Sequence, residues 1–184
     1  MMELTRDEVL DKLLRSCETW YDIERTDGPA PLAATAFFHE HGEKYVISRK
    51  AQLWAADQYE YLWFYSVPVL TADIAKECIE RTRTLGEERI APHKDHMSSY
   101  AVAILLCDSA EPDAVSVVKH CHYRKSFQYS LQGWMELHSI LINRDTGEVL
   151  SNSDGRQTAK SLKDALYPAP KERARLARIL KELF

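Results

Sequence analysis

The chain has 184 residues, of which 45% are apolar and 28% charged, and its formal net charge is −4. This composition is typical of a globular protein and excludes long disordered or low-complexity segments. No apolar run approaches the roughly 20 residues of a membrane span, and the N-terminus lacks the apolar core of a secretion signal. We therefore expect one globular α+β domain, residues 1–184, in the cytoplasm, with no membrane partner. The acidic balance also disfavours nucleic acid as a partner.

The first predicted element is a helix that begins after Thr5. Thr5 and Glu8 have the spacing of a capping box, in which each side chain accepts a hydrogen bond from the other residue's backbone N–H. Apolar residues then recur at the three-and-four spacing of one helix face: Leu10, Leu13, Leu14, Cys17, Trp20 and Tyr21. The glycine and two prolines within residues 27–31 predict the end of this helix.

Three strands are predicted next, because three segments are rich in β-branched or aromatic residues. They are ATAFFHEH, which ends near residue 41, KYVISRKAQLW from about residue 44, and YEYLWFYSV from about residue 59. We place a tight turn between the first two strands, at His41, Gly42 and Glu43.

A second helix is predicted from an N-cap at Thr71 to about Leu85, with Gly86 positioned to end it. The segment SSYAVAILLC, residues 98–107, follows and is apolar on both alternating sets of positions. This pattern is typical of a strand that is covered on both faces. We therefore expect an inner strand with a neighbour on each side.

The rest of the chain adds one more strand–helix–strand unit. A short helix is predicted near Pro112, and a strand from about Phe127 to Asn143 leads through the turn NRDTGE to a short partner around Val149 and Leu150. Helices near residues 158–167 and 170–183 finish the chain. This order predicts an α+β (mixed α/β) fold: a mixed sheet of five or six strands, with an N-terminal helix, a crossover helix and C-terminal helices packed on it.

Six of the seven histidines fall in three close pairs, which makes a divalent metal the cofactor to consider. On a strand, His39 and His41 point to the same face, whereas His93 and His96 fall in a predicted loop. A catalytic metal usually needs three protein ligands, and each pair supplies two. These four residues are candidate metal ligands, the alternative is solvated surface histidines, and no cofactor is predicted.

The third pair, His120 and His122, flanks Cys121 at the end of a predicted helix. Side chains two residues apart on a helix diverge by about 200°, so the two imidazoles form a poor local chelate. A helix end, with Cys121 facing the core, is the preferred interpretation.

Residues 54–65 hold six of the 18 aromatic side chains. Strand alternation places Tyr59, Tyr61, Trp63 and Tyr65 on one face, with Leu62 and Phe64 on the other. Together with Trp54, the four form a candidate ligand-binding face. The alternative is a second core layer beneath a helix.

The order of a helix, three strands, a helix and a further strand, over about residues 5–107, resembles the core of restriction-endonuclease-like nucleases. The resemblance implies a divalent metal held by an acidic residue near the second strand and by a D/E-x-K triplet on the third. Here Asp57 precedes the third strand and Glu60 begins it, but Leu62 stands where the lysine belongs. The resemblance therefore implies the fold rather than the activity.

The predicted C-terminal helix carries a narrow apolar stripe: Leu176, Ile179, Leu180 and Leu183. Such a stripe needs cover, so we expect the helix to dock on its own domain, with a homo-oligomer through this helix as the alternative. The sequence as a whole predicts a non-catalytic ligand- or partner-binding module. The alternative function is a divalent-metal-dependent hydrolase with a nuclease-like core.

Overall fold

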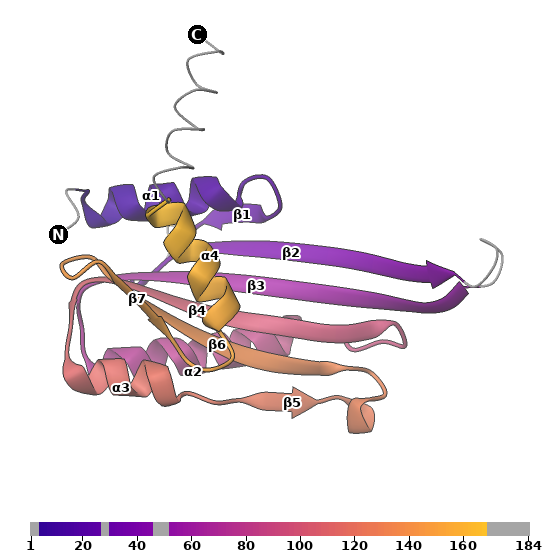
Figure 1. Cartoon of the computed structure of the whole chain (residues 1–184). Helices are drawn as coiled ribbons and strands as arrows, with labels where there is room; N and C mark the ends of the chain where they lie inside the picture. The colour runs from indigo at the N-terminus through magenta and orange to yellow at the C-terminus, as the bar shows by residue number, and fades with distance from the viewer. Residues whose placement is uncertain (1–3, 27–29, 46–51, 169–184) are drawn as a thin grey trace, which may run out of the picture.

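The computed structural model describes residues 4–26, 30–45 and 52–168, with the backbone alone for 40–45 and 52–57. Its helices and strands follow one another along the chain as shown in Figure 1. They are α1 (Arg6–Cys17), β1 (Asp22–Arg25), β2 (Leu32–Tyr45), β3 (Gln52–Leu70), α2 (Ala72–Arg89), β4 (His96–Ala110), α3 (Pro112–His120), β5 (Arg124–Ser126), a 3-10 turn (Gln128–Ser130), β6 (Trp134–Asn143), β7 (Glu148–Ser151) and α4 (Arg156–Leu166).

The described strands form one mixed sheet in the order β1-β2-β3-β4-β6-β5, and β7 also pairs with β6. The strands β3, β4 and β6 are parallel to one another, and the other pairings are antiparallel. The predicted mixed sheet is confirmed, with seven described strands in place of the expected five or six. The prediction of β4 as an inner strand is also confirmed, because β3 and β6 lie on either side of it.

Helices cover both faces of this sheet (Figure 1). The helices α2 and α3 pack on one face, and α1 and α4 pack on the other. The central strand β4 is apolar on both of its faces because each face is covered by helices. Ala101, Ala103 and Leu105 point toward α2 and α3. Val102 and Ile104 point toward α1 and α4. Strand alternation alone therefore assigns its residues to two separate cores.

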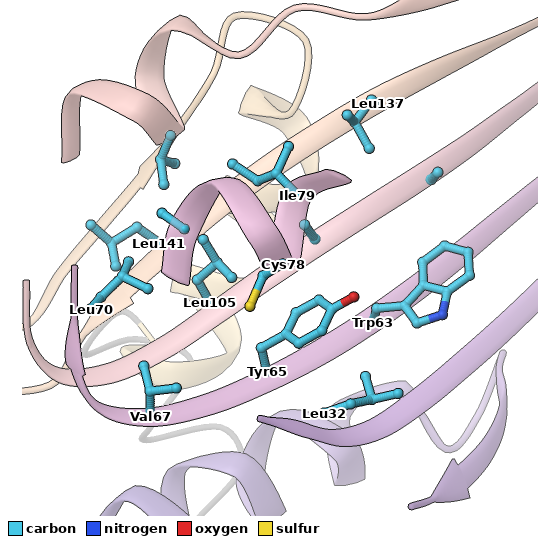
Figure 2. Packing of buried hydrophobic residues seen from close by; sticks show 14 of the residues in the cluster. Leu32, Trp63, Tyr65, Val67, Leu70, Cys78, Ile79, Leu105, Leu137 and Leu141 are labelled. Atoms are coloured by element: carbon cyan, nitrogen blue, oxygen red, sulfur yellow. The ribbon is translucent and has the colours of Figure 1, made fainter. Parts of the chain in front are cut away.

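The core beneath α2 is shown in Figure 2. Trp63 and Tyr65 of β3 lie under this helix and are 2% and 1% exposed, respectively. Cys78 and Ile79 of α2 pack against them from above, together with Leu105 of the central strand. The predicted alternation in β3 is confirmed, because Leu62 and Phe64 belong to the opposite core.

The predicted N-caps Thr5 and Thr71 are confirmed, but the predicted ends of α1 and α2 are wrong. The helix α1 ends at Cys17, so Trp20 and Tyr21 lie outside it. Thr5 and Glu8 form the complete capping box, and Thr71 caps α2 through a bond from the backbone N–H of Ile74. Gly86 does not end α2, which continues to Arg89. A Cβ atom at Gly86 would lie 2.8 Å from the Cβ of Ala101, so the glycine lets the helix approach the sheet closely.

Four strand predictions need correction. His41, Gly42 and Glu43 form no turn, because β2 continues through them to Tyr45. The predicted strand from about residue 44 to 54 is not a separate strand, because its described ends belong to β2 and to β3, which runs from Gln52 to Leu70. The short edge strand β1 was not predicted, since its four residues carry only one apolar side chain, Ile23. The expected strand from residue 127 to 143 is interrupted by a turn at Gln128–Ser130, and β6 begins only at Trp134.

Two connections cross over between parallel strands where the sequence indicated one crossover helix. The helix α2 joins β3 to β4, and α3 joins β4 to β6. The helix predicted at 158–167 corresponds to α4. The helix predicted at 170–183, with its expected docking or oligomer contact, lies outside the described residues. None of the described helices is long and apolar enough to cross a membrane.

Candidate functional site

The side chains Tyr59, Tyr61, Trp63 and Tyr65 form an aromatic strip along one face of β3. Its inner end, Trp63 and Tyr65, lies beneath α2. Its outer end reaches past the last residue of α2, so that Tyr59 is only partly buried. The strip is continuous, because Tyr61 stacks on Trp63 with ring centroids 5.9 Å apart. One part of the predicted aromatic face is therefore core, and the other part borders a cavity.

This cavity, which we call the α2 pocket, has a volume of about 180 Å³. It lies where α2 ends and β4 begins, and Ile90 and Ala91 of that connection form part of its wall. Its polar lining comes from three segments of the chain: Tyr59, Tyr61, Arg89, His93, His96 and Ser99. The parallel pairing of β3 with β4 sets this arrangement, since Tyr59 lies opposite Ser99 and Asp57 lies opposite His96.

His96 is held from both sides of its ring. It is 4% exposed, with Nδ1 at 2.6 Å from the carbonyl oxygen of Gln132 and Nε2 at 2.8 Å from Oγ of Ser99. A carbonyl only accepts, so Nδ1–H donates to Gln132, and in the neutral ring Nε2 accepts the proton of Ser99. Phe127 contacts the same ring edge-on at 5.6 Å. His96 is therefore a fixed part of the pocket wall.

Tyr59 stands between two imidazole rings. The ring of His39 stacks on one side at 4.4 Å with an interplanar angle of 4°, and His96 lies at 5.9 Å with an angle of 22°. The hydroxyl of Tyr59 lies 3.2 Å from Nε2 of His93, within hydrogen-bonding distance. These contacts cover both faces of the tyrosine ring and fix its position in the lining of the pocket.

Arg89 and Tyr61 supply the polar groups of the pocket that have no partner among the described residues. Arg89 is exposed and, in the part of the chain that the structure describes, has no hydrogen bond or ion pair. Tyr61 is 9% exposed, and its hydroxyl likewise has no protein partner among the described residues. Burial raises the pKa of Tyr61, so its hydroxyl keeps its proton at neutral pH and remains a donor.

The structure brings three of the four candidate metal ligands together around Tyr59: His39, His93 and His96. His39 belongs to one predicted pair, and His93 and His96 form another. The two pairs meet because β2, β3 and the start of β4 lie side by side. Both nitrogens of His96 are already hydrogen-bonded. No group of three His, Cys, Asp or Glu residues within the described ranges is arranged to hold a metal.

Two candidate residues, His41 and Trp54, have described backbones only. His41 pairs with Asp57, and Trp54 pairs with Lys44, both in the β2–β3 ladder. Their side chains lie outside the part that the structure describes, so the roles predicted for them stay predictions.

The His-Cys-His segment is confirmed as a helix end. His120 is the last residue of α3, and its Nδ1 lies 2.9 Å from the carbonyl oxygen of Ser116. His122 instead pairs with Asp154, with Nδ1 at 3.0 Å from a carboxylate oxygen. Cys121 is partly buried against the α2-side core.

The acidic position of the nuclease resemblance lies on the opposite face of the sheet. The carboxylate of Glu60 accepts bonds from the hydroxyls of Tyr21 and Thr158, at 2.5 and 3.2 Å. Leu62, which stands at the lysine position, is 2% exposed in the core under α1. The side chain of Asp57 lies outside the described side chains.

Two larger hollows have charged linings that are paired only in part among the described residues. In one of about 530 Å³, between α1 and β1, Arg25 pairs with Asp11. In one of about 300 Å³, near the start of α1, Asp108 pairs with both Arg6 and Arg144. The smaller α2 pocket differs because it combines aromatic side chains with Arg89 and the hydroxyl of Tyr61, which have no partner among the described residues.

Sequence reasoning found Tyr59, Tyr61, His93 and His96 but missed Arg89, Ser99 and the carbonyl of Gln132. Arg89 looked like one more charge after Gly86, because the helix was expected to end there. Had α2 been extended by one turn, Arg89 would have fallen in its last turn, directly before the histidine loop. Ser99 gave no signal of its own, since its role depends on the ring of His96.

No curated protein and no solved structure matches this chain significantly. A family model described as "Domain of unknown function (DUF8052)" matches residues 5–164. This match covers α1 through most of α4, including every described residue of the α2 pocket. The chain therefore belongs to the DUF8052 family.

Proposed function

We propose that this protein is a ligand-binding module and that the α2 pocket is its binding site. The observation that carries the proposal is the pairing of an aromatic wall with polar groups that have no partner in the described part of the chain. Tyr59 and His96 form the wall, while Arg89 and the hydroxyl of Tyr61 border the same cavity. Binding sites typically combine apolar and aromatic walls with a few polar groups that orient the ligand.

The size of the cavity restricts the ligand. At about 180 Å³ the α2 pocket is smaller than the roughly 300–1,000 Å³ of pockets that take drug-sized molecules. A small molecule, or one group of a larger one, fits this space.

The arrangement favours binding over catalysis. Ser99 is fully buried, and its hydroxyl is bonded to His96. His96 in turn is fixed by the carbonyl of Gln132, which only orients the ring and carries no charge. A nucleophile must reach its substrate, and a serine with no exposed surface does not.

Ligand-observed NMR of the full chain with a library of small aromatic compounds tests the proposal. Ala91 is exposed and lines the pocket, so Ala91→Phe fills the cavity without disturbing buried packing. Thr84→Phe, at an exposed position on α2 outside the pocket, is the matched control. We expect hits that bind the wild type and the Thr84 variant and are lost in the Ala91 variant. Hits that survive Ala91→Phe unchanged contradict the proposal.

The alternative is a divalent-metal-dependent hydrolase, and it is supported by the order of α1, three strands, α2 and β4. The position of the lysine in that resemblance is a buried leucine, and Glu60 is bonded to Tyr21 and Thr158. Incubation of the purified chain with plasmid DNA and either Mg²⁺ or Mn²⁺ tests it. Cleavage that depends on the metal and is lost in Glu60→Gln supports this alternative.

A further inference from the structure

We propose that the α2 pocket selects a carboxylate, which Arg89 and the hydroxyl of Tyr61 recognise together. This inference rests on the proposed binding function and names the chemical class of its ligand.

The first support is the state of Arg89. The other arginine near the end of α2, Arg83, is engaged with Glu80 and Glu87 on the same helix. Arg89 lies less than two turns further on and has no carboxylate partner among the described residues. It lines the cavity, so its guanidinium is available to an occupant. Guanidinium presents parallel N–H donors that match a carboxylate in a bidentate arrangement.

The second support is the neighbouring hydroxyl. Tyr61 lines the same cavity and lies close enough to Arg89 for the positive charge to act on its phenol. With its proton retained, the phenol is a second hydrogen-bond donor in the lining of the same cavity. Two donors of different geometry, one of them charged, complement an anion and not a cation.

The end of α2 offers a competing explanation for Arg89. The C-terminus of a helix carries partial negative charge, which a cation in the last turn offsets. This effect accounts for a basic residue at the helix end, but it does not require that the residue border a cavity. The shared cavity with Tyr61 and Tyr59 distinguishes the binding role from the dipole effect.

The aromatic lining refines the ligand class. Tyr59, Tyr61 and His96 border the cavity, and the two faces of Tyr59 are covered by His39 and His96. A small flat acid, with its carboxylate conjugated to a ring or double bond, contacts the edges of these rings while its oxygens reach Arg89.

Binding of matched carboxylate and amide pairs tests the inference: benzoate with benzamide, nicotinate with nicotinamide, and acetate with acetamide. Each pair has nearly the same shape and differs in charge. In NMR titrations of the full chain we expect at least one ring acid to bind roughly tenfold or more tightly than its amide. A tenfold ratio corresponds to about 1.4 kcal/mol.

Variants of the full chain show which residues cause the preference for the acid over the amide. Arg89→Gln should remove the preference for the acid while leaving amide binding unchanged, and Arg89→Lys should restore part of it because a point charge remains. Tyr61→Phe should reduce the preference severalfold. Arg81→Gln, at another arginine of α2 that does not line the pocket, is the control and should change nothing.

The outcomes separate the two proposals. Equal binding of acids and amides that is lost in Ala91→Phe overturns the carboxylate inference and leaves the binding function standing. Acid selectivity that persists in Arg89→Gln also overturns the inference. Absence of binding by every compound of this panel and of the aromatic library overturns the binding function, and the inference with it.

Discussion

The two ends of the aromatic strip have the same sequence pattern and opposite environments. Trp63 and Tyr65 lie under α2 and are almost fully buried, whereas Tyr59 and Tyr61 lie near the C-terminal end of the helix and border the pocket. Alternation along β3 decides which face the side chains occupy, but the length of α2 decides which of them become core. The boundary between core and site is therefore set by the residue at which α2 ends.

The largest expected effect is at the inner end. Trp63→Ala should lower the free energy of unfolding by about 3–5 kcal/mol, because it leaves a large cavity beneath α2. Tyr59→Ala should cost only about 1–2 kcal/mol, since it removes ring contacts at a site already open to solvent. Chemical denaturation of both variants measures the difference. Equal losses would show that the outer end is as much a part of the core as the inner end.

The next largest loss of stability is expected at Gly133, in the turn that holds His96 beside the outer end of the aromatic strip. Gly133 has φ of +72°, and a Cβ atom there would lie 2.3 Å from the carbonyl oxygen of Met97 and 2.7 Å from Nδ1 of His96. Gly133→Ala should therefore cost about 2–4 kcal/mol in backbone strain and crowding. It should also shift the ring resonances of His96 in NMR spectra while those of Trp63 stay unchanged. An unchanged His96 ring would mean that the bond to Gln132 does not depend on this turn.

The hydroxyl groups of the strip provide a subtler test. Tyr65 Oη lies 2.9 Å from Oγ1 of Thr82, whose own proton goes to the carbonyl of Cys78, so the tyrosine donates. Tyr65→Phe removes this buried bond and should cost about 1 kcal/mol. Tyr61→Phe should leave the stability nearly unchanged, because its hydroxyl has no protein partner among the described residues. Thermal denaturation of the pair checks the contrast, and a larger loss for Tyr61→Phe would reverse it.

The smallest effect on stability is expected from His138, a buried histidine on the other face of the sheet. Unlike His96, it is not held by hydrogen bonds among the described residues. His138 is 6% exposed, and neither ring nitrogen has a hydrogen-bond partner among the described residues. Its Nε2 is 3.8 Å from the Glu136 carboxylate, too far for a hydrogen bond. Burial lowers the pKa of His138 below its ordinary value of 6.5, although nearby Glu60 and Glu136 oppose the shift.

The pH dependence follows from that direction. As the pH falls below about 6.5, the unfolded chain takes up a proton at His138 before the folded chain does, so the stability decreases until the folded pKa is passed. His138→Phe should flatten this part of the curve of unfolding free energy against pH. His122→Phe, at an exposed histidine that pairs with Asp154, serves as the control. An equally steep curve in His138→Phe would assign the acid sensitivity to other groups.

Local signals predicted much of this fold correctly. The capping residues Thr5 and Thr71 mark true helix starts, and the doubly apolar pattern of β4 identified the centre of the sheet. The errors arose where a local rule competed with packing. Gly86 is a common helix-ending residue, but here it permits close contact with Ala101, and Gly42 lies in a strand rather than a turn.

The candidate site was less accessible to sequence reasoning, for a physical reason. The histidine pairs were examined as neighbours in sequence, whereas the contacts that matter join His39 to Tyr59 and Tyr59 to His96. Those contacts depend on the register between β2 and β3 and between β3 and β4. No local pattern fixes the register of parallel strands joined by a helix, so the pocket became visible only in the assembled sheet.

The parallel arrangement at the centre of the sheet also has a consequence for the speed of folding. Tyr61 pairs with Ala101, and Ala101 pairs with Leu137, so each contact closes a loop of roughly 40 residues. The chain loses the entropy of these loops before either ladder gains its full set of bonds. Helices such as α2 form from local contacts, whereas β4 must wait for partners on both sides. Folding should therefore be slow for a chain of this length, with the central strand completed late.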